Sequence, residues 1–430
     1  DCLLSRGLGD VYKRQMLKLD DRIYFSSISY NNRYNRYWDN LRLHVPDGGV
    51  FAIDLGWRIN PNRFIGRVGT WSIPFPQDVM PEYAMPQYDP YFKMTWAEVT
   101  DLQALKVKQG ISEGKKYAVM FSGGIDSTVI MVSLLKNLTP EECQSLLIVS
   151  SQNTIIENPR FWQKYIQGKF TVMDSTKIKY DGLIKLGYIP ITGDLGDNMF
   201  GTLAGLNLFF TYSSLVKKLS PERAEAVYKL KDAVTDDSVH WSRYTDILIQ
   251  YFQHPRNPKF GQQLHEKIAR NIQDAPMPIH SLQDYFWWEM FNLKYSNCAS
   301  RGSIYLNDTL PVPEVVDKTV NWYNDADYQR WSMVNNGNGQ KIRKSAATYK
   351  WTAREYIYEF DHNDWYFNFK PKIESLGPGV SLHQNLAGIP FEKRPIHRFG
   401  LDKNYEILYM TDPAVTEYIE HHLFQFNVDW

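Results

Sequence analysis

Lys116-Tyr117-Ala118-Val119-Met120-Phe121-Ser122-Gly123-Gly124-Ile125-Asp126-Ser127-Thr128 is the stretch that decides the fold of this chain. Its apolar run from Tyr117 to Phe121 predicts a strand that is covered on both faces. Gly123 and Gly124 allow a tight turn and a close approach of the backbone to a ligand. The mostly apolar residues after Ser127 predict a helix that packs on a sheet. We therefore expect a strand, a turn and a helix in that order.

The turn in this stretch is a candidate anion site. The N-terminus of a helix presents backbone N–H groups and a positive partial charge. We expect Ser122, Gly123, Gly124 and Ser127 to surround that site, and Asp126 lies in the same turn. A carboxylate beside bound phosphates requires a cation such as Mg²⁺ between them. The alternative is an ordinary glycine turn between a strand and a helix.

The composition of the chain narrows the class of protein. Its 430 residues suffice for two or three domains. Lys plus Arg and Asp plus Glu both number 48, so nothing in the net charge indicates a nucleic-acid partner. Three cysteines without a Cys-x-x-Cys pair indicate a reducing cytoplasm. No apolar run reaches the ~18 residues of a membrane span, so we expect no membrane partner.

The sequence divides into four parts: residues 1–15, 16–95, 96–215 and 216–430. The first resembles the translated read-through of a sequencing adapter, and a Met follows it, so we expect a non-native or disordered arm; a genuine N-terminal arm is the alternative. The second predicts a small β-rich region with strands over 22–28 and 49–55. The third predicts an α/β core, and the fourth a mainly helical part that completes the acceptor pocket.

Strands and helices alternate within the third part of the chain. A helix is predicted over 96–108, strands over 146–149 and 170–173, and a further strand ending near Ile191. Such alternation predicts a parallel twisted sheet with flanking helices and a ligand at the carboxyl ends of the strands. Further helices are predicted in the fourth part, over 221–234, 281–292 and 349–360. The first two are expected to be amphipathic, and Trp287 and Trp288 are expected to be core residues.

A second motif, Gly187-Tyr188-Ile189-Pro190-Ile191-Thr192-Gly193-Asp194-Leu195-Gly196-Asp197-Asn198-Met199-Phe200-Gly201, repeats the plan of a strand, a glycine turn and a helix. Asp194 and Asp197 are close in sequence, and two neighbouring carboxylates repel each other. Mg²⁺ held over phosphates would offset that repulsion. A solvated Asp-Gly turn with an N-cap is the alternative.

Together the two motifs resemble the PP-loop superfamily of ATP pyrophosphatases and, within it, the synthetase domain of the asparagine synthetase family. The resemblance implies an adenine nucleotide alpha hydrolase-like fold, Mg²⁺ ligands at Asp126 and Asp197, and a catalytic acid/base or positioning role for Asp194. It assigns nucleotide binding to Met120, Ser122, Gly123, Gly124, Asp126, Ser127, Val149, Thr192 and Gly193.

The same family carries a later Lys-x-x-x-Arg helix, which Lys350 and Arg354 match in type and spacing. There the lysine neutralises charge that develops on the transferred phosphate. The resemblance therefore makes Lys350 and Arg354 catalytic candidates. A solvated helix face is the alternative. Lys370 and Lys372 follow, and they either add positive charge to the site or face water.

The resemblance implies an ATP-dependent ligase that adenylates a small-molecule carboxylate, releases pyrophosphate and transfers nitrogen to form an amide. ATP and Mg²⁺ are the expected cofactors. The chain shows no Met-Cys-Gly start of a glutaminase domain, so the nitrogen is expected from ammonia, a substrate amine or a separate glutaminase partner. Leu195 and Asn198 depart from the family pattern and leave the acceptor open. The alternatives are a tRNA-modifying PP-loop ATPase and a non-catalytic ATP-binding protein.

Overall fold

The computed structural model describes residues 16–19, 22–25, 83–151, 157–175, 177–201, 221, 225, 229, 237–252, 260–292, 295, 298–299, 302–303, 306–337 and 350–369. The chain divides into two units that interleave along the sequence. The first, which we call the sheet unit, contains Lys93–Gly196, Val315–Trp331 and Asn338–Trp430. The second unit contains Asp1–Phe92, Asp197–Glu314 and Ser332–Gly337.

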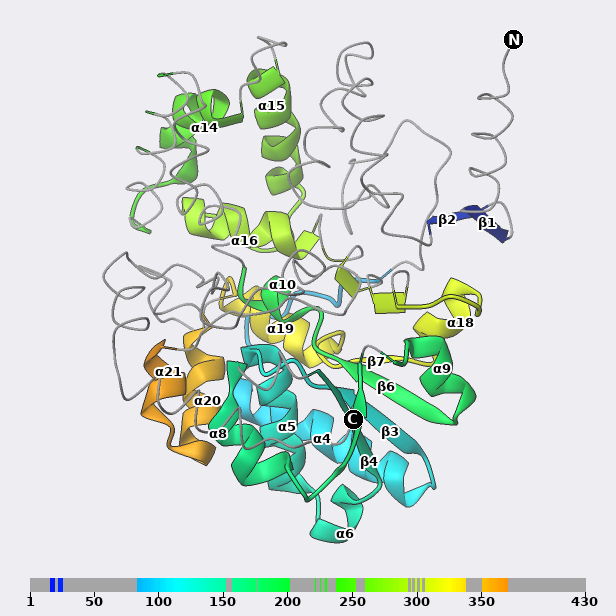
Figure 1. The fold of residues 1–430 in the computed structure, drawn as a ribbon. Coiled ribbons are helices and arrows are strands. Elements are labelled where there is room, and N and C mark those ends of the chain that lie inside the picture. Colours follow the sequence, from blue (N-terminus) through cyan, green and yellow to red (C-terminus); the bar gives the residue numbers. More distant parts are fainter. Residues whose placement is uncertain are drawn as a thin grey trace, which may run out of the picture. The chain divides into compact units, whose positions relative to one another are not determined.

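The sheet unit is an α/β structure built on a five-stranded parallel sheet (Figure 1). In the order β5-β4-β3-β6-β7, its strands are Thr171–Asp174, Leu146–Ser150, Lys116–Met120, Tyr188–Thr192 and Val320–Asn321. The prediction of a parallel sheet with flanking helices is thus confirmed. The sequence did not predict β7, because a strand of two residues carries no readable periodicity.

The strand order places a topological switch beside β3. From β3 the chain continues to β4 and β5 on one side, and it then returns to β6 on the other side. Met120 pairs with Val149 of β4, and Val119 pairs with Ile191 of β6. The turns that follow β3 and β6 therefore emerge side by side at the carboxyl edge of the sheet. Open α/β sheets bind their ligands in the crevice at such a switch.

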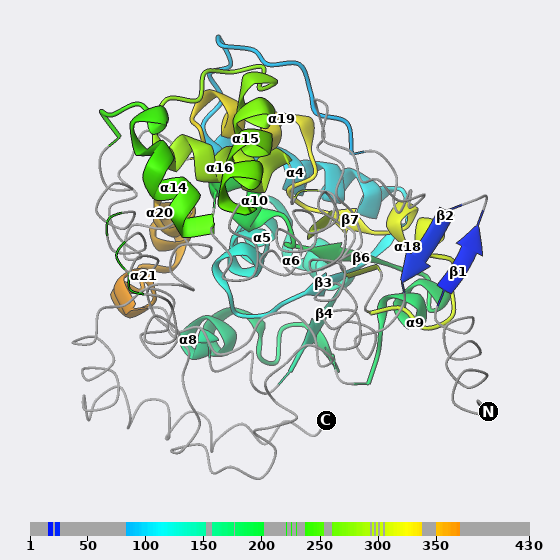
Figure 2. The same ribbon diagram turned by 90° about the horizontal axis from the view of Figure 1, so that it is seen from above.

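Both faces of β3 are covered, which explains its apolar sequence. Successive side chains of a strand point to opposite faces of the sheet. Tyr117 contacts Gly110 of α4 (Trp96–Ser112), where an added Cβ would lie 1.9 Å from the tyrosine oxygen. Ala118 packs with Leu183 of α9 (Tyr180–Lys185) in a buried cluster. The view in Figure 2 shows β3, β4 and β6 with α4, α5 and α9 around them.

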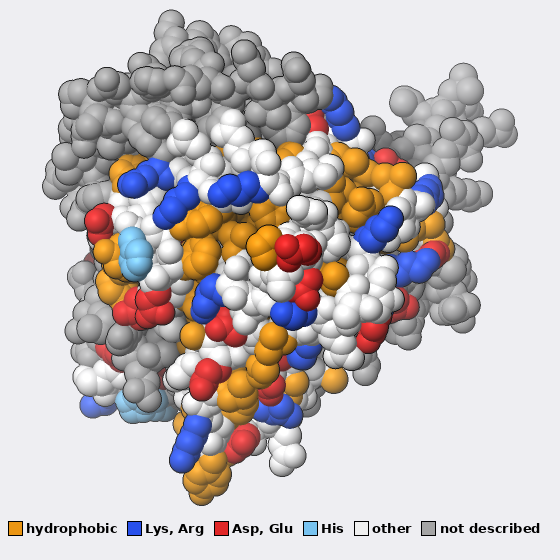
Figure 3. Space-filling view, turned by 90° about the horizontal axis from the view of Figure 1, so that it is seen from below, with side chains coloured by type: hydrophobic (Ala, Val, Ile, Leu, Met, Phe, Trp, Pro, Cys, Tyr) orange, Lys and Arg blue, Asp and Glu red, His pale blue; other side chains and the backbone are white. Residues whose placement is uncertain are grey.

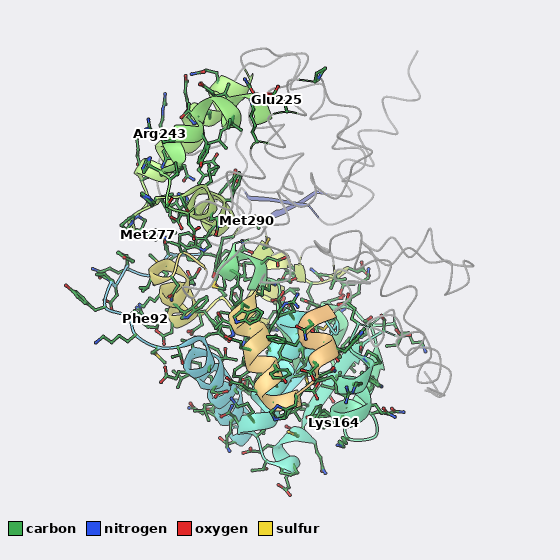
Figure 4. All side chains as sticks on the ribbon, turned by 90° about the vertical axis from the view of Figure 1, so that its left-hand side faces the viewer. Phe92, Lys164, Glu225, Arg243, Met277 and Met290 are labelled. Atoms are coloured by element: carbon green, nitrogen blue, oxygen red, sulfur yellow. The ribbon has the colours of Figure 1, made fainter. Side chains whose placement is uncertain are left out.

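Several helices flank the sheet. α5 (Ile125–Asn137) follows β3 and packs on α4 and β3. α20 (Trp351–Asp361) packs on α5 and α4, and α21 (Asp364–Phe369) lies beside α20 (Figure 4). The remaining short helices of this unit are α6 (Pro140–Cys143), α8 (Pro159–Phe161) and the π-helix η1 (Trp162–Ile166). Lys164 of η1 lies 3.6 Å from a carboxylate oxygen of Asp361, so η1 is tied to the end of α20.

The second unit contains an antiparallel strand pair and several helices. β1 (Met16–Leu19) pairs with β2 (Arg22–Phe25), which overlaps the strand predicted over 22–28. Its helices are η2 (Trp241–Tyr244), α14 (Thr245–Phe252), α15 (Phe260–Gln273) and α16 (Leu282–Asn292). Three further helices, α10 (Gly196–Phe200), α18 (Val312–Asp317) and α19 (Ala326–Val334), cross the boundaries between the units.

The helix predicted over 281–292 is present, but its predicted amphipathic character was wrong. The helix over 281–292 was expected to be amphipathic, whereas almost every side chain of α16 is buried. Its neighbouring Trp287 and Trp288 are fully buried, as expected for core residues. Trp287 Nε1 donates to Ser332 Oγ at 3.0 Å, which satisfies the indole inside the core. Gln283, Glu289 and Asn292 are buried in α16 together with its apolar side chains. The polar residues of this helix therefore do not mark a side that faces solvent.

Several predictions fall outside the described residues: 1–15, the strand over 49–55, and Lys370 and Lys372. Of the helix predicted over 221–234, only residues 221, 225 and 229 are described, and all three are helical. Cys143 and Cys298 are free and buried, as expected of structural cysteines. Within the described part of the chain, no helix has both the length and the apolar character needed to cross a bilayer.

Candidate active site

Residues 122–127 form the turn between β3 and α5, which we call the phosphate loop. Gly123 has a positive φ of 68°, a conformation that glycine adopts without a Cβ clash. The Ser122 N–H donates to Ser127 Oγ at 3.1 Å, and Ser127 Oγ donates to the Gly124 carbonyl at 3.2 Å. The first N–H groups of α5 have no acceptor within the helix. The loop thus has the form of an anion site, and the Ser127 hydroxyl bridges its two ends.

A tyrosine from the end of the described chain also holds the phosphate loop. Tyr366 of α21 donates its hydroxyl to the Gly123 carbonyl at 2.9 Å. Thr128 Oγ1 lies 3.4 Å from the same carbonyl and 3.2 Å from Tyr366 Oη. Sequence reasoning missed Tyr366, because its aromatic run carries no motif.

Asp126 is paired with the predicted catalytic lysine. Lys350 Nζ lies 2.5 Å from Asp126 Oδ1 and 2.6 Å from Oδ2. The side chain of Lys350 is 3% exposed and that of Asp126 is 27% exposed. The structure therefore brings together two predicted site residues that are 224 positions apart. A buried ammonium needs a partner, and the Asp126 carboxylate provides one.

Lys350 precedes its helix, whereas the sequence placed it on the helix. It is the N-cap of α20, in the left-handed conformation with φ 54° and ψ 37°. A residue other than glycine pays roughly 1–2 kcal/mol for that conformation. Strain of this kind persists only where surrounding contacts impose it, and it clusters at functional sites. The pairing with Asp126 supplies such a contact.

Tyr323 holds the backbone of the same aspartate. Its hydroxyl donates to the Asp126 carbonyl at 2.9 Å. Burial, and then the charge of Asp126, raises the pKa of Tyr323 well above its usual value. The phenol therefore stays protonated and remains a donor. Tyr323 follows β7, so the unpredicted fifth strand also positions a residue of the site.

Residues 193–196 form the turn after β6, which we call the acidic loop. Asp194 in this loop is 6% exposed. A Cβ on Gly196 would lie 2.1 Å from Asp126 Oδ1, and a Cβ on Gly193 would lie 3.1 Å from Asp126 Cβ. The two glycines therefore allow the acidic loop to contact the phosphate loop. Asp197 is exposed in the first turn of α10, and it is the first residue of the Asp197–Glu314 segment of the second unit.

The residues predicted to hold the nucleoside lie at the ends of three strands. Met120 and Val149 are register partners at the carboxyl ends of β3 and β4, and Met120 packs against the cluster that contains Val149. Thr192 ends β6 and is 2% exposed. Its Oγ1 has no hydrogen-bond partner within the described residues. A buried hydroxyl in this position is costly unless a ligand satisfies it, so the site fits a polar ligand.

Arg354 makes a contact that differs from the predicted one. Its Nη1 donates to the Phe367 carbonyl of α21 at 2.6 Å, and the residue is 8% exposed. This contact ties α20 to α21, so it describes a structural role. A catalytic role for Arg354 stays a prediction.

The side chains of the site also bear on whether it could hold a metal ion. Among the described residues, no group of three or more His, Cys, Asp or Glu side chains could hold an ion. Mg²⁺ in nucleotide sites takes one or two carboxylates and completes its shell with phosphate oxygens and water. Asp126 fits that requirement as a residue type, and an ion there would share the carboxylate with Lys350. Asp197 belongs to the other unit, so its part in a metal site stays a prediction. The face shown in Figure 3 mixes positive and negative side chains, without a uniformly basic surface among the described atoms.

No family model, curated protein or solved structure matches the chain. Any functional assignment consequently depends on the residues of the two loops and on the contacts among them.

Proposed function

We propose that the chain is an ATP-dependent, AMP-forming amide ligase that resembles the synthetase domain of the asparagine synthetase family. The observation that carries the proposal is the contact of Lys350 with both carboxylate oxygens of Asp126. The Lys-x-x-x-Arg spacing identified Lys350 in the sequence, and its ammonium contacts Asp126 of the phosphate loop. A solvated helix face, the alternative for this motif, is incompatible with a lysine that is 5% exposed.

The loops suggest a division of labour for nucleotide binding. The N–H groups at the start of α5 would bind phosphate oxygens of ATP, with Ser122 and Ser127 beside them. Asp126 and Asp197 would hold Mg²⁺, which, when bound, neutralises phosphate charge. The ends of β3, β4 and β6 would hold the adenosine through Met120, Val149, Thr192 and Gly193.

The charged side chains suggest the catalytic roles. Lys350 would stabilise the negative charge that develops on the reacting phosphates, where a buried cation acts more strongly than in water. Asp194, buried in the acidic loop, would accept a proton from the attacking nitrogen. The acceptor is a small-molecule carboxylate, and the nitrogen comes from ammonia, a substrate amine or a separate glutaminase partner. The free, buried thiols of Cys143 and Cys298 agree with a cytoplasmic enzyme.

The proposal is tested by release of pyrophosphate and AMP from Mg-ATP. The assay combines the full chain with a panel of carboxylates, with and without ammonium. We expect release that depends on one acceptor and disappears in Asp126→Asn. Glu113→Gln is the matched control, since it removes an exposed carboxylate that pairs with Lys115 at 2.7 Å outside the loops.

Three outcomes would overturn the ligase assignment in different ways. If the chain does not bind ATP, the proposed nucleotide site is wrong. Binding of ATP without release of pyrophosphate under any acceptor would identify a non-catalytic ATP-binding protein. Release that requires transfer RNA in place of a carboxylate would identify a tRNA-modifying ATPase.

A further inference from the structure

The hydrogen bond from Tyr366 to the Gly123 carbonyl also affects the direction of the Gly124 N–H. The Gly123 carbonyl and the Gly124 N–H belong to the same planar peptide, and in the trans form they point in opposite directions. No cis peptide occurs among the described residues. Holding the carbonyl toward Tyr366 therefore turns the Gly124 N–H away from Tyr366.

The Gly124 N–H is directed toward the candidate anion site. It donates to Ser122 Oγ at 3.4 Å, a long hydrogen bond that a phosphate oxygen can replace. If this peptide turned over, the carbonyl would take that place and would repel a phosphate. Glycine on both sides of the peptide makes such a rotation sterically easy, because neither residue has a Cβ. Hydrogen bonds to the Gly123 carbonyl oppose that rotation: Tyr366 donates the shorter one at 2.9 Å, and Thr128 Oγ1 donates a longer one at 3.4 Å.

We propose that Tyr366 is a positioning residue for the phosphate loop, which holds the Gly123–Gly124 peptide so that its N–H faces the phosphates of the nucleotide. This inference rests on the proposed function, because it takes residues 122–127 as the phosphate site. It adds a residue to which neither motif points.

The surroundings of Tyr366 equip it for this role. The residue is 1% exposed, and its own N–H is bound to Asn363 Oδ1 at 3.1 Å. Thr128 Oγ1 donates to the same carbonyl at 3.4 Å and lies 3.2 Å from Tyr366 Oη, so both hydroxyls gather at the Gly123 carbonyl. Burial raises the pKa of Tyr366 well above its usual value, so the phenol remains a donor. Arg354, through Phe367, fixes the helix that carries the tyrosine.

The test compares Tyr366→Phe with Tyr328→Phe in the full chain. Tyr328 is an equally buried tyrosine of the sheet unit, whose hydroxyl donates to Thr100 at 2.9 Å and accepts from Trp322 at 2.8 Å. Calorimetry measures the Kd for Mg-ATP, Mg-pyrophosphate and adenosine well below the melting temperature. We expect Tyr366→Phe to weaken ATP and pyrophosphate about tenfold and leave adenosine unchanged. Tyr328→Phe should lower the melting temperature without changing the three affinities.

The outcomes separate this inference from the proposed function. Equal pyrophosphate affinity in Tyr366→Phe and the unaltered chain would overturn the positioning role, whatever the melting temperatures. An equal loss of affinity for all three ligands would also overturn it, since that result indicates general damage. A loss confined to ATP and pyrophosphate supports the role even if no acceptor yields AMP, in which case only the ligase assignment fails. A chain that binds neither ATP nor pyrophosphate would overturn both.

Discussion

The phosphate loop and the acidic loop share one plan and differ in the contacts that fix them. Each follows a parallel strand, contains glycine and leads into a helix. Hydrogen bonds hold the phosphate loop, from its own serines and from Tyr366. The acidic loop has one internal backbone hydrogen bond, from the Gly196 N–H to the Gly193 carbonyl at 3.1 Å, and close packing adds to it, because a Cβ on Gly196 would collide with the Asp126 carboxylate.

This difference has consequences for how each loop tolerates change. A hydrogen bond contributes a modest net amount, about 1 kcal/mol, so the phosphate loop should weaken gradually as bonds are removed. A Cβ that would lie 2.1 Å from Asp126 Oδ1 forces a larger change, since the carboxylate must move away and Lys350 holds it in place. Substitutions in the two loops can therefore test whether the distinction is real.

The largest effect is expected from Gly196→Ala. The added methyl group would collide with Asp126 Oδ1, so Asp126 must move and its pairing with Lys350 is disturbed. We expect a loss of about 3 kcal/mol of unfolding free energy and no measurable ATP binding. Denaturant melts and calorimetry provide the measurements.

Gly114→Ala is the control for this substitution. Gly114 has a positive φ of 85° but open space around a Cβ, so only backbone strain of about 1 kcal/mol is expected. If Gly196→Ala is as stable as Gly114→Ala and still binds ATP, close packing does not shape the acidic loop.

A smaller effect is expected from Lys350→Met. Removing the ammonium leaves a half-buried carboxylate without its main cation, which should cost about 2 kcal/mol because Asp126 keeps some access to water. A double-mutant cycle with Asp126→Asn should recover more than half of that cost as coupling. AMP formation should fall by at least a hundredfold, since the cation acts on the reacting phosphates.

The matched variant for the ion pair is Lys136→Met. Lys136 of α5 lies 3.0 Å from Asp101 in a pair with both side chains about one third exposed, and its Nζ lies 4.3 Å from the centroid of the Tyr356 ring. Losing both contacts should cost less than about 1 kcal/mol. Equal stability losses in Lys350→Met and Lys136→Met would mean that burial does not strengthen the pair at Asp126.

The smallest effect is expected from Ser127→Ala. The hydroxyl accepts from the Ser122 N–H and donates to the Gly124 carbonyl, so its removal should cost about 1 kcal/mol and weaken ATP several-fold. Ser133→Ala, farther along α5, removes a buried hydroxyl that donates to the Thr100 carbonyl at 2.8 Å. It should lose similar stability and keep its ATP affinity. An unchanged ATP affinity in both variants would show that Ser127 does not shape the phosphate loop.

The sequence predicted those features that depend on local pattern. The apolar runs of β3, β4 and β6 identified the centre of the parallel sheet, and the glycine turns identified where the loops lie. Lys350 was found by its spacing from Arg354, although its contact with Asp126 depends on the tertiary fold.

Features that depend on tertiary contacts were not predictable. β7 is two residues long, and only its pairing with β6 makes it a strand. Tyr323 and Tyr366 are two of 28 tyrosines, and nothing in their neighbours marks them as loop contacts. The left-handed conformation of Lys350 has no local signature either, and the residue that its side chain contacts, Asp126, is 224 positions away in sequence.

The interleaved order of the units also has a consequence for synthesis on the ribosome. The phosphate loop emerges early, whereas Lys350 and Tyr366 follow their partners in it by 224 and 243 residues. At about 5–20 residues per second, that interval lasts roughly ten to fifty seconds. During that time the nascent chain carries the nucleotide motif without the side chains that fix it. Under the proposed function, ATP would therefore bind the complete site only after α20 and α21 have been translated.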